Sequence, residues 1–373
     1  GKAAEFSKEY ALDEGRVLRF LQATQPEKVK AAHILDSEYE RNKFFVSLRK
    51  KLGEAGIIDI LRNGFRYLAY KFDLYYSTPS EQNPMAKALY ARNIFSVTRQ
   101  VTYSKEFPRL ALDLAIFING LPIATFELKN RLTKQNVDDA VNQYMNDRDP
   151  KELIFNFKLC AVHFAVDDNE VKMCTRLCGK ASWFLPFNKG NNDGAGNPPN
   201  PDGIKTDYLW KEILTKESLS NILENYSQVV EKIDRKTNKV VGETMIFPRY
   251  HQLTVVRKLL ADTLRNEVGK RYLIQHSAGS GKSNSIAWLA YQLVKLEKSG
   301  KTFFDSIIVV TDRVNLDRQI RDTIRQFMQE RSVVGWADDS STLGSLLNAG
   351  KKIIITTIHT FPFILSSIGT ENK

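Results

Sequence analysis

The sequence predicts an α/β protein in which a mixed sheet with flanking helices is followed by part of a parallel α/β unit. A β-hairpin pattern covers residues 112–129, and a helix with apolar positions at i, i+3, i+4 and i+7 follows it. After residue 272 the pattern becomes strand, loop, helix, strand, helix, strand, which is typical of a parallel sheet. At 373 residues the chain is long enough for two domains.

The composition indicates a globular protein with a polyanionic partner. The formal net charge is +11 and the isoelectric point is about 9.3, which favours nucleic acid, although scattered surface lysines would give the same charge. No apolar run approaches the roughly 20 residues of a membrane span, and the first ten residues do not form a signal peptide. We therefore expect no membrane partner and a cytoplasmic location.

Cysteine usage fits the same compartment. Cys160, Cys174 and Cys178 are too few and too clustered for a disulfide framework. A zinc site that adds His163 is conceivable, but no paired CxxC occurs and ordinary buried thiols are favoured.

Residues 1–187 are expected to form the first domain. Apolar spacing, glycines, prolines and β-rich runs predict its elements before the hairpin. These are helices within 12–53, including 38–52, a helix at 57–63, a strand at 66–76, a short helix at 85–93 and a strand at 95–103.

The hairpin at 112–129 carries Asp113 on its first strand and Glu127 and Lys129 on its second. If its Asn119-Gly120 turn were a plain two-residue turn, Asp113 would pair with Phe126 and Glu127 would project from the opposite face. A three-residue loop or a single bulge brings Asp113 opposite Glu127, and we predict the bulge.

The rest of the first domain follows from helix caps and turn residues. Thr133 is expected to cap the next helix, which carries Gln143, and strands are expected at 158–166 and 170–177. Residues 188–246 are expected to form a loop and helical linker. Its Asn-, Gly- and Pro-rich stretch 188–203 fits either a flexible linker or an ordered loop, and helices are expected at 208–214 and 218–226.

The third region, 247–373, contains the strongest local motif, HSAGSGKS from His276. We expect a strand at 272–275, then a loop, then a helix from 284 to 296, which is the context that a phosphate-binding loop needs. The backbone of the glycine-containing loop and the helix N-terminus would bind phosphates. The residues expected to hold a nucleotide are Gly279, Ser280, Gly281, Lys282 and Ser283, with Lys282 on the β- and γ-phosphates and Ser283 on Mg²⁺.

The sequence around this loop resembles superfamily 2 helicases, some of which tolerate a residue such as His276 in place of the first glycine of the motif. The stretch FPRYHQ is similar to their adenine-reading segment, with Gln252 as its glutamine. Thr311-Asp312-Arg313, with Leu316 and Gln319, looks like a DNA-contacting motif, and the strand 352–357 ends in a Thr pair similar to the next one. The resemblance implies a partial RecA-like motor domain that binds ATP. Because no DEAx motif follows, we expect a fragment that can hold a nucleotide at best.

Two carboxylates and a lysine on one hairpin meet the requirements of phosphodiester cleavage. Asp113 and Glu127 offer hard oxygen ligands for Mg²⁺, and Lys129 lies on the same strand face as Glu127, where it can orient a water molecule. The pattern resembles PD-(D/E)xK nucleases, with Leu112 in place of the proline. An isolated ExK triplet is more often a solvated strand face, so the surrounding segments decide.

Those segments occur in a distinctive order: LDLAIFINGLPIATFELK, DAVNQYMNDRDP, LPFNKGNNDGAGNPPNPDG, FPRYHQ and HSAGSGKS. Together they resemble the R subunit of type I restriction endonucleases, over residues 17–368. The resemblance implies a PD-(D/E)xK nuclease domain fused to a double-stranded DNA translocase. It also implies modification and specificity subunits as partners, which use S-adenosylmethionine. Gln143 matches the Gln of a Gln-x-x-x-Tyr motif found in such nucleases, but Asp147 stands at the tyrosine position.

We therefore expect Mg²⁺-dependent cleavage of foreign DNA, with catalytic residues Asp113, Glu127, Lys129 and Gln143, and ATP-driven translocation in the intact subunit. One alternative is a superfamily 2 helicase or remodeller whose N-terminal domain binds DNA without cleaving it. Another is a basic, non-enzymatic DNA-binding protein. Loss of cleavage in Asp113→Ala, with ATPase retained, would distinguish the first from the others.

Overall fold

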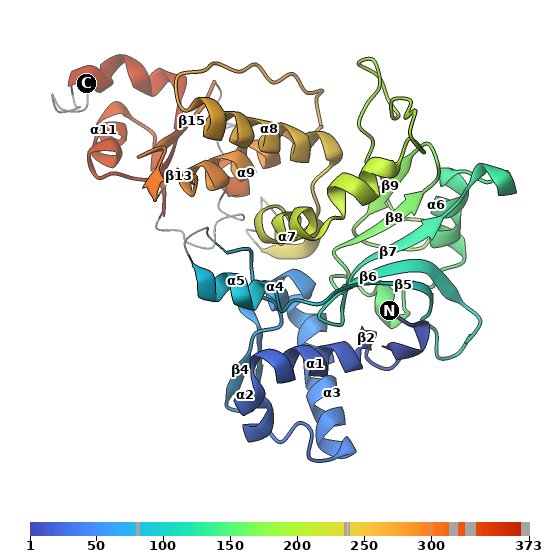
Figure 1. The fold of residues 1–373 in the computed structure, drawn as a ribbon. Coiled ribbons are helices and arrows are strands. Elements are labelled where there is room, and N and C mark those ends of the chain that lie inside the picture. Colours follow the sequence, from blue (N-terminus) through green and yellow to red (C-terminus); the bar gives the residue numbers. More distant parts are fainter. Residues whose placement is uncertain are drawn as a thin grey trace. The chain divides into compact units, whose positions relative to one another are not determined.

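The computed structural model describes residues 1–79, 83–234, 237, 239–298, 300–312, 320–324 and 333–366. The chain forms two compact units, Gly1–Arg249 and Tyr250–Lys373 (Figure 1). Both combine helices with sheets, as expected for an α/β protein. In the described part of the chain, no helix is both long and apolar enough to cross a bilayer. The expected boundaries at 187 and 246 stay a prediction.

A helical layer opens the first unit and confirms the helices expected before residue 64. It comprises η1 (Ala3–Glu5), β1 (Phe6–Ser7), β2 (Leu12–Asp13), α1 (Glu14–Thr24), α2 (Pro26–Ala31), α3 (Glu38–Ala55) and α4 (Ile57–Asn63). Asp13 and Ser37 cap α1 and α3 by accepting hydrogen bonds from backbone N–H groups. Phe44 of α3 is fully buried and makes edge-on ring contacts with Phe45, Phe65 and Phe72, which closes this layer.

The single strand expected at 66–76 is wrong. The chain reverses there to form a small antiparallel hairpin of β3 (Phe65–Tyr67) and β4 (Tyr70–Phe72). Leu68 adopts a φ of 52°, which allows the tight turn. A positive φ is uncommon for residues other than glycine, so the sequence does not indicate a turn there. The alternation continues on both arms, so the sequence pattern hides the reversal. The helix and strand that follow agree with expectation as α5 (Pro84–Tyr90) and β5 (Phe95–Thr102).

A six-stranded mixed sheet is the centre of the first unit, in the order β10-β9-β8-β7-β6-β5. The strands that complete it are β6 (Ala111–Ile118), β7 (Leu121–Leu128), β8 (Val162–Val166), β9 (Val171–Cys174) and β10 (Leu185–Pro186). β7 and β8 are parallel and every other neighbouring pair is antiparallel. β7 is buried from Leu121 to Glu127 and β8 is buried over its whole length, so the middle of the sheet is shielded from solvent.

Helix α6 (Val137–Asn146) contacts β7 and β8, but it does not begin where the sequence indicated. Thr133 ends the short turn η2 (Arg131–Thr133) and does not cap the helix. Asn136 is the cap: its side chain accepts hydrogen bonds from the N–H groups of Asp138 and Asp139, and the Asp139 side chain accepts one from the N–H of Asn136. The sequence offers several capping residues in succession, and only the backbone path selects among them.

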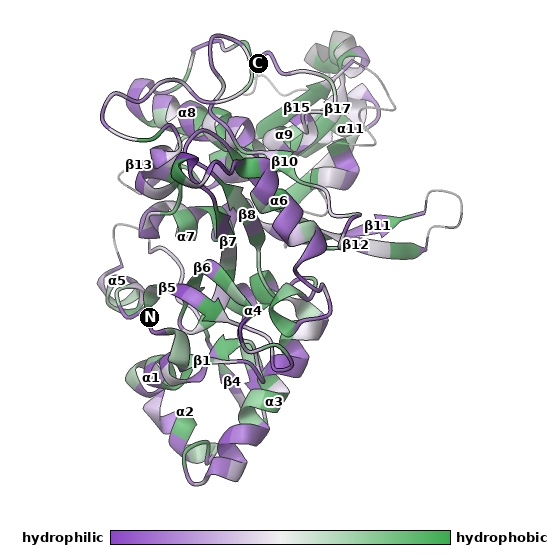
Figure 2. Cartoon of the chain, turned by 90° about the vertical axis from the view of Figure 1, so that its right-hand side faces the viewer, coloured by the Kyte–Doolittle hydropathy of each residue, from purple (hydrophilic) through white to green (hydrophobic). Residues whose placement is uncertain are grey.

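One of the remaining elements of the first unit lies between α6 and β8, and the others follow the sheet. They are η3 (Leu153–Phe155), a π-helical turn (Leu209–Ile213), α7 (Lys216–Asn225), β11 (Gln228–Ile233) and β12 (Val240–Ile246). Figure 2 shows the β11–β12 hairpin extending away from the six-stranded sheet. The loop 188–203 is hydrogen-bonded to the turn between β8 and β9, because buried Asn197 donates to the Asn169 carbonyl. Asn197 also donates to the side chain of Asn188 within the loop.

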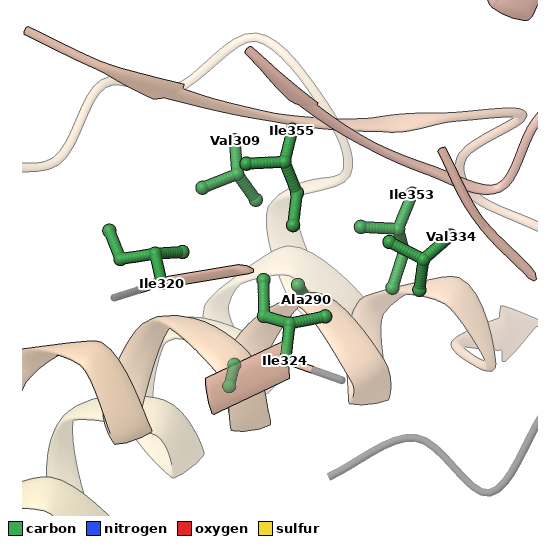
Figure 3. Close-up of a cluster of buried hydrophobic side chains, with 8 residues drawn as sticks. Ala290, Val309, Ile320, Ile324, Val334, Ile353 and Ile355 are labelled. Carbon is green, nitrogen blue, oxygen red and sulfur yellow. The ribbon is translucent and has the colours of Figure 1, made fainter. Parts of the chain in front are cut away.

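The second unit contains a three-stranded parallel sheet in the order β15-β17-β16. Its elements are α8 (Tyr250–Asn266), α9 (Lys282–Val294), β13 (Glu297–Lys298), β14 (Lys301–Thr302), β15 (Ile307–Thr311), β16 (Val334–Ala337), α11 (Ser340–Asn348), β17 (Ile353–Thr357) and η6 (Ile358–Ser366). Figure 3 shows its core, in which Ala290 of α9 lies under Val309, Ile353 and Ile355 of the sheet. The strand expected at 352–357 and the helix expected after the glycine-containing loop are confirmed.

The strand expected at 272–275 is wrong. This stretch has no regular secondary structure, and no described strand pairs with it. Leu273 is 95% exposed, so its apolar side chain is not covered by a neighbouring sheet layer. A buried parallel strand needs hydrogen-bonded neighbours as well as apolar residues, and the local sequence shows only the second requirement.

Candidate active site

The β6–β7 hairpin contains the bulge on which the predicted site depends. Asn119 and Gly120 form the turn with φ values of 51° and 83°, and Ile118 pairs with Leu121. The register then shifts between Ile116 and Phe117, which leaves Ile123 as the extra residue on β7. From Ile116 and Ala124 onward the pairing continues to Leu114 and Phe126, so the next step places Asp113 opposite Glu127. The predicted bulge is confirmed.

Close packing explains why glycine occupies the turn. The Gly120 carbonyl accepts a hydrogen bond from the N–H of Asp13 at 2.8 Å. A Cβ atom at Gly120 would collide with the Asp13 carbonyl and with Val17, and the positive φ would strain any other residue. The N-terminal layer therefore packs directly on the hairpin that carries the carboxylates.

Asp113 sits at the accessible edge of the site. Its side chain is half-buried; Oδ2 accepts the N–H of Leu128 at 2.8 Å, and Oδ1 lies 3.4 Å from Nε2 of Gln100, which donates to it. The bond from Leu128 attaches the carboxylate to strand β7, one residue beyond Glu127, and the bond from Gln100 attaches it to strand β5. They fix its direction while leaving lone pairs on both oxygens.

Glu127 is fully buried and has one oxygen without a partner. Oε1 accepts a hydrogen bond from Nε of Arg148 at 2.7 Å, whereas Oε2 has no hydrogen-bond partner among the described residues. Burial is the main cause that raises the pKa of Glu127 to about 7; the Arg148 guanidinium lowers this pKa, and the neighbouring Asp113 carboxyl makes a smaller contribution that raises it. A buried carboxylate oxygen left unpaired beside a second carboxylate is an arrangement suited to a cation.

Arg148 is the residue that the sequence analysis missed. It lies two residues beyond the last residue of α6, is 5% exposed, and also donates to the Ala111 carbonyl at 2.9 Å and to the Tyr103 hydroxyl at 3.3 Å. Arginines on helix ends are usually solvated, so its type and position carried no signal. Its separation from Glu127 by 21 residues is outside any local motif.

Lys129 and Gln143 meet across the space between β7 and α6. Nζ of Lys129 donates to Oε1 of Gln143 at 2.5 Å, and both side chains are half-buried. The backbone N–H of Lys129 donates to the Val166 carbonyl, which holds the residue at the end of β7. The structure thus brings Gln143 to the lysine, while Asp147 is exposed.

A second polar group is buried on the same face of β7, next to the carboxylates. The Thr125 hydroxyl lies 2.8 Å from the Tyr144 hydroxyl and 2.7 Å from Nδ1 of His163. Burial lowers the pKa of His163 to about 3, so its ring is neutral at physiological pH. Tyr144, which directly follows Gln143, is fully buried, and the contact between its hydroxyl and that of Thr125 anchors α6 to the sheet.

The residues expected to bind a nucleotide lie together in the second unit. Gly279 and Gly281 have φ values of 72° and 81°, and α9 begins at Lys282, whose Nζ donates to the His276 and Ser277 carbonyls. Gln252 of α8 is buried and donates to the carbonyls of Ser280 and Gly281 at 3.2 and 2.9 Å. Glycine suits position 281 because of its positive φ, and a Cβ atom there would also displace the end of the Gln252 side chain.

Only part of the predicted DNA-contacting segments of the second unit lies within the described residues. Thr311 and Thr356 are buried at the ends of β15 and β17, and the Thr356 hydroxyl donates to the Ala337 carbonyl at 2.9 Å. Arg313, Leu316 and Gln319 lie outside the described residues.

The cysteines are separate from these sites. Cys160 and Cys174 are buried, Cys178 is exposed, and all three are free thiols. His163 accompanies none of them in a metal-binding group, because the described residues contain no cluster of three or more His, Cys, Asp or Glu side chains suited to a metal ion.

Two protein families match the two units of the chain. Residues 18–181 match the family described as type I restriction enzyme R protein N terminus, and residues 251–371 match the SWI2/SNF2 ATPase family. The first match covers the helical layer from residue 18 onward, the β6–β7 hairpin and α6, and the second covers the glycine-containing loop and the parallel sheet.

Curated relatives have names that agree with these matches. A putative type I restriction enzyme MjaVIIIP endonuclease subunit from Methanocaldococcus jannaschii is 27% identical over 243 residues, which cover 62% of this chain and 21% of the relative. The type I restriction enzyme HindI endonuclease subunit from Haemophilus influenzae is 26% identical over 264 residues, covering 67% of this chain and 23% of the relative. The chain thus spans about a quarter of the length of the curated relatives it matches.

Proposed function

We propose that the chain contains the DNA-cleaving and nucleotide-binding parts of a type I restriction subunit, because residues 18–181 match the family described as type I restriction enzyme R protein N terminus. In this proposal the first unit is a PD-(D/E)xK nuclease and the second is part of a RecA-like motor. The observation that carries it is the β7 bulge, because it places Asp113 opposite Glu127 with Lys129 on the Glu127 face.

Asp113 and Glu127 fit a magnesium ion. Oxygen donors are the ligands that Mg²⁺ prefers; Oε2 of Glu127 is buried without a hydrogen-bond partner among the described residues, and the Asp113 carboxyl is close enough to raise the pKa of Glu127. Mg²⁺ bound there would neutralise charge on the scissile phosphate of DNA. Asp113 keeps its direction through the N–H of Leu128, and Glu127 keeps its direction through Arg148.

Lys129 supplies the positive group of the proposed reaction. Its Nζ would hold the attacking water and stabilise the charge that develops on the phosphate oxygens. Gln143 accepts from that ammonium without neutralising it, so it directs Nζ and leaves the positive charge available. Gln143 is thus proposed to act through Lys129.

The second unit is proposed to bind ATP through the loop that precedes α9. Backbone N–H groups from Gly279 to Gly281 would cradle the phosphates, Lys282 would contact the β- and γ-phosphates, and Ser283 would bind Mg²⁺. Gln252 already packs against this loop and is proposed to sit beside the adenine. ATP-driven translocation would then belong to the whole subunit.

The proposed substrate is foreign double-stranded DNA, which the net charge of +11 would attract. The proposed partners are modification and specificity subunits, through which alone S-adenosylmethionine would act. A cytoplasmic location is part of the proposal, in keeping with three free thiols. The SWI2/SNF2 match of residues 251–371 also supports the alternative of a helicase or remodeller whose N-terminal domain only binds DNA.

Substitution of Asp113 by Ala tests the proposal. In the assembled restriction complex the substitution is expected to abolish DNA cleavage while ATP hydrolysis and translocation continue, because the change lies in the first unit. Cleavage is measured as nicking and linearisation of a plasmid that carries the recognition site. Cleavage by the Asp113→Ala complex at the wild-type rate would contradict the nuclease assignment and favour the alternative.

A further inference from the structure

Arg148 is held in a way that directs one carboxylate oxygen of the proposed metal site. We infer that Arg148 is a positioning residue that fixes the Glu127 carboxylate so that Oε2, beside Asp113, binds a divalent cation. This inference rests on the proposed nuclease function and adds a residue that no sequence motif contains.

The guanidinium connects both strands of the hairpin. Its Nε donates to Oε1 of Glu127 on β7 at 2.7 Å, and its Nη2 donates to the carbonyl of Ala111 on β6 at 2.9 Å. Ala111 lies two residues before Asp113, so one rigid planar group ties the Glu127 side chain to the strand that bears the second carboxylate. Nη1 donates to the Tyr103 hydroxyl at 3.3 Å, which completes a three-point attachment.

Burial makes this attachment specific. The side chains of Glu127 and Arg148 are 0% and 5% exposed, so water does not compete for the ion pair. The pair occupies Oε1 and leaves Oε2 without a hydrogen-bond partner among the described residues. A carboxylate held through one oxygen has little rotational freedom, and its other oxygen keeps a fixed position.

Lysine cannot reproduce this arrangement. An ammonium group is a point charge and lacks the planar fork that reaches Glu127, Ala111 and Tyr103 together. Arg148→Lys should therefore retain part of the function, whereas Arg148→Met, which has a similar stem and no charge, should lose it.

The test is calorimetric titration of the chain 1–373 with Mn²⁺, for the wild type and four variants. Arg148→Met is expected to weaken Asp113-dependent Mn²⁺ binding by about 10- to 100-fold, and Arg148→Lys by a smaller factor. Asp113→Ala is expected to remove this binding event. Thermal unfolding is recorded for every variant.

Arg62→Met is the matched control. Arg62 is another partly buried arginine of the first unit, and it donates to the carbonyls of Leu223, Glu224 and Ser227 at 2.8, 3.0 and 2.6 Å. Its loss should lower stability without changing the Mn²⁺ dissociation constant. A purely structural role for Arg148 predicts that both methionine variants lose stability and both keep wild-type Mn²⁺ affinity.

The outcomes separate the inference from the proposed function. Wild-type Mn²⁺ affinity in Arg148→Met or in Arg148→Lys, together with loss of binding in Asp113→Ala, overturns the inference alone. Absence of any Asp113-dependent Mn²⁺ binding in the wild type overturns the metal site and the inference together. If Arg148→Met fails to fold, Arg148→Lys decides.

Discussion

At the scale of single residues, the first unit buries two titratable groups with opposite shifts in pKa on neighbouring strands, Glu127 on β7 and His163 on β8. Burial raises the pKa of Glu127 to about 7 and lowers the pKa of His163 to about 3. In both cases desolvation disfavours the charged form. Glu127 has a cationic partner in Arg148, whereas His163 contacts the neutral Thr125 hydroxyl. Protonation of Glu127 and protonation of His163 therefore occur in different pH ranges.

His163 should make the fold less stable in acid. The unfolded chain takes up a proton on this ring below its usual pKa of 6.5, and the folded chain does so only near pH 3. The free energy of unfolding should therefore fall with decreasing pH between these values, by up to about 1.4 kcal/mol per unit. Urea unfolding of the wild type and His163→Gln from pH 7 to 4 measures this. The gap between their pH slopes should disappear above pH 7, and equal slopes below pH 6 would contradict the burial argument.

At the scale of elements, α6 brings Gln143 into contact with Lys129, and the residue at which α6 begins determines which way Gln143 faces. Asn136 caps the helix, and the N–H of Val137 donates to the Asp167 side chain at 2.8 Å. The start of the helix is thereby tied to the end of β8. Position along α6 then decides that Gln143 faces Lys129 while Tyr144 points to Thr125.

Asn136→Ala should destabilise the first unit by about 1 kcal/mol, because two N–H groups at the start of α6 lose their acceptor. Thr133→Ala is the matched comparison, since the sequence alone favours Thr133 as the cap. Among the residues that the structure describes, its hydroxyl bonds only to the exposed Asn130 and Gln135, so its removal should cost less. Chemical denaturation of both variants measures the difference. A larger loss in Thr133→Ala would show that the helix begins earlier than the structure has it.

Pattern reasoning succeeded where one face of an element had to be buried. The parity argument for Asp113 and Glu127 required a bulge, and the register shift at Ile116 and Phe117 is that bulge. It failed where a distant contact decides. The turn at Leu68 depends on a positive φ that a non-glycine residue rarely adopts. The stretch 272–275 is exposed because no neighbouring strand covers it. The ion pair between Arg148 and Glu127 joins residues that are far apart in the sequence.

At the scale of the whole molecule, the chain combines a hairpin carrying carboxylates with a glycine-containing loop in a separate unit. The roles of Asp113, Glu127, Lys129 and Gln143 stay predictions, although the fold brings Lys129 to Gln143 and Asp113 opposite Glu127. The same holds for the loop residues around Lys282. Separate units predict that a change at Asp113 removes cleavage without removing ATP binding, whereas a change in the loop removes ATP binding and with it the cleavage that depends on ATP.

Lys282→Ala should abolish ATP-dependent cleavage in the assembled complex and weaken ATP binding by the chain more than tenfold, because the cation that faces the phosphates is lost. Binding of a fluorescent ATP analogue and plasmid cleavage measure the two effects. Lys295→Ala, at the other end of α9, is the matched control and should change neither. Equal ATP affinity in the wild type and Lys282→Ala would contradict the assignment of the loop.

The central claim is that Asp113 and Glu127 together bind a divalent cation. A crystal structure of the chain soaked in Mn²⁺, with anomalous scattering recorded, tests it most directly. We predict one strong peak bonded to the Asp113 carboxylate and to Oε2 of Glu127, at distances of about 2.1 to 2.2 Å, with Arg148 still on Oε1. Absence of a peak between these carboxylates at millimolar Mn²⁺ would contradict the account.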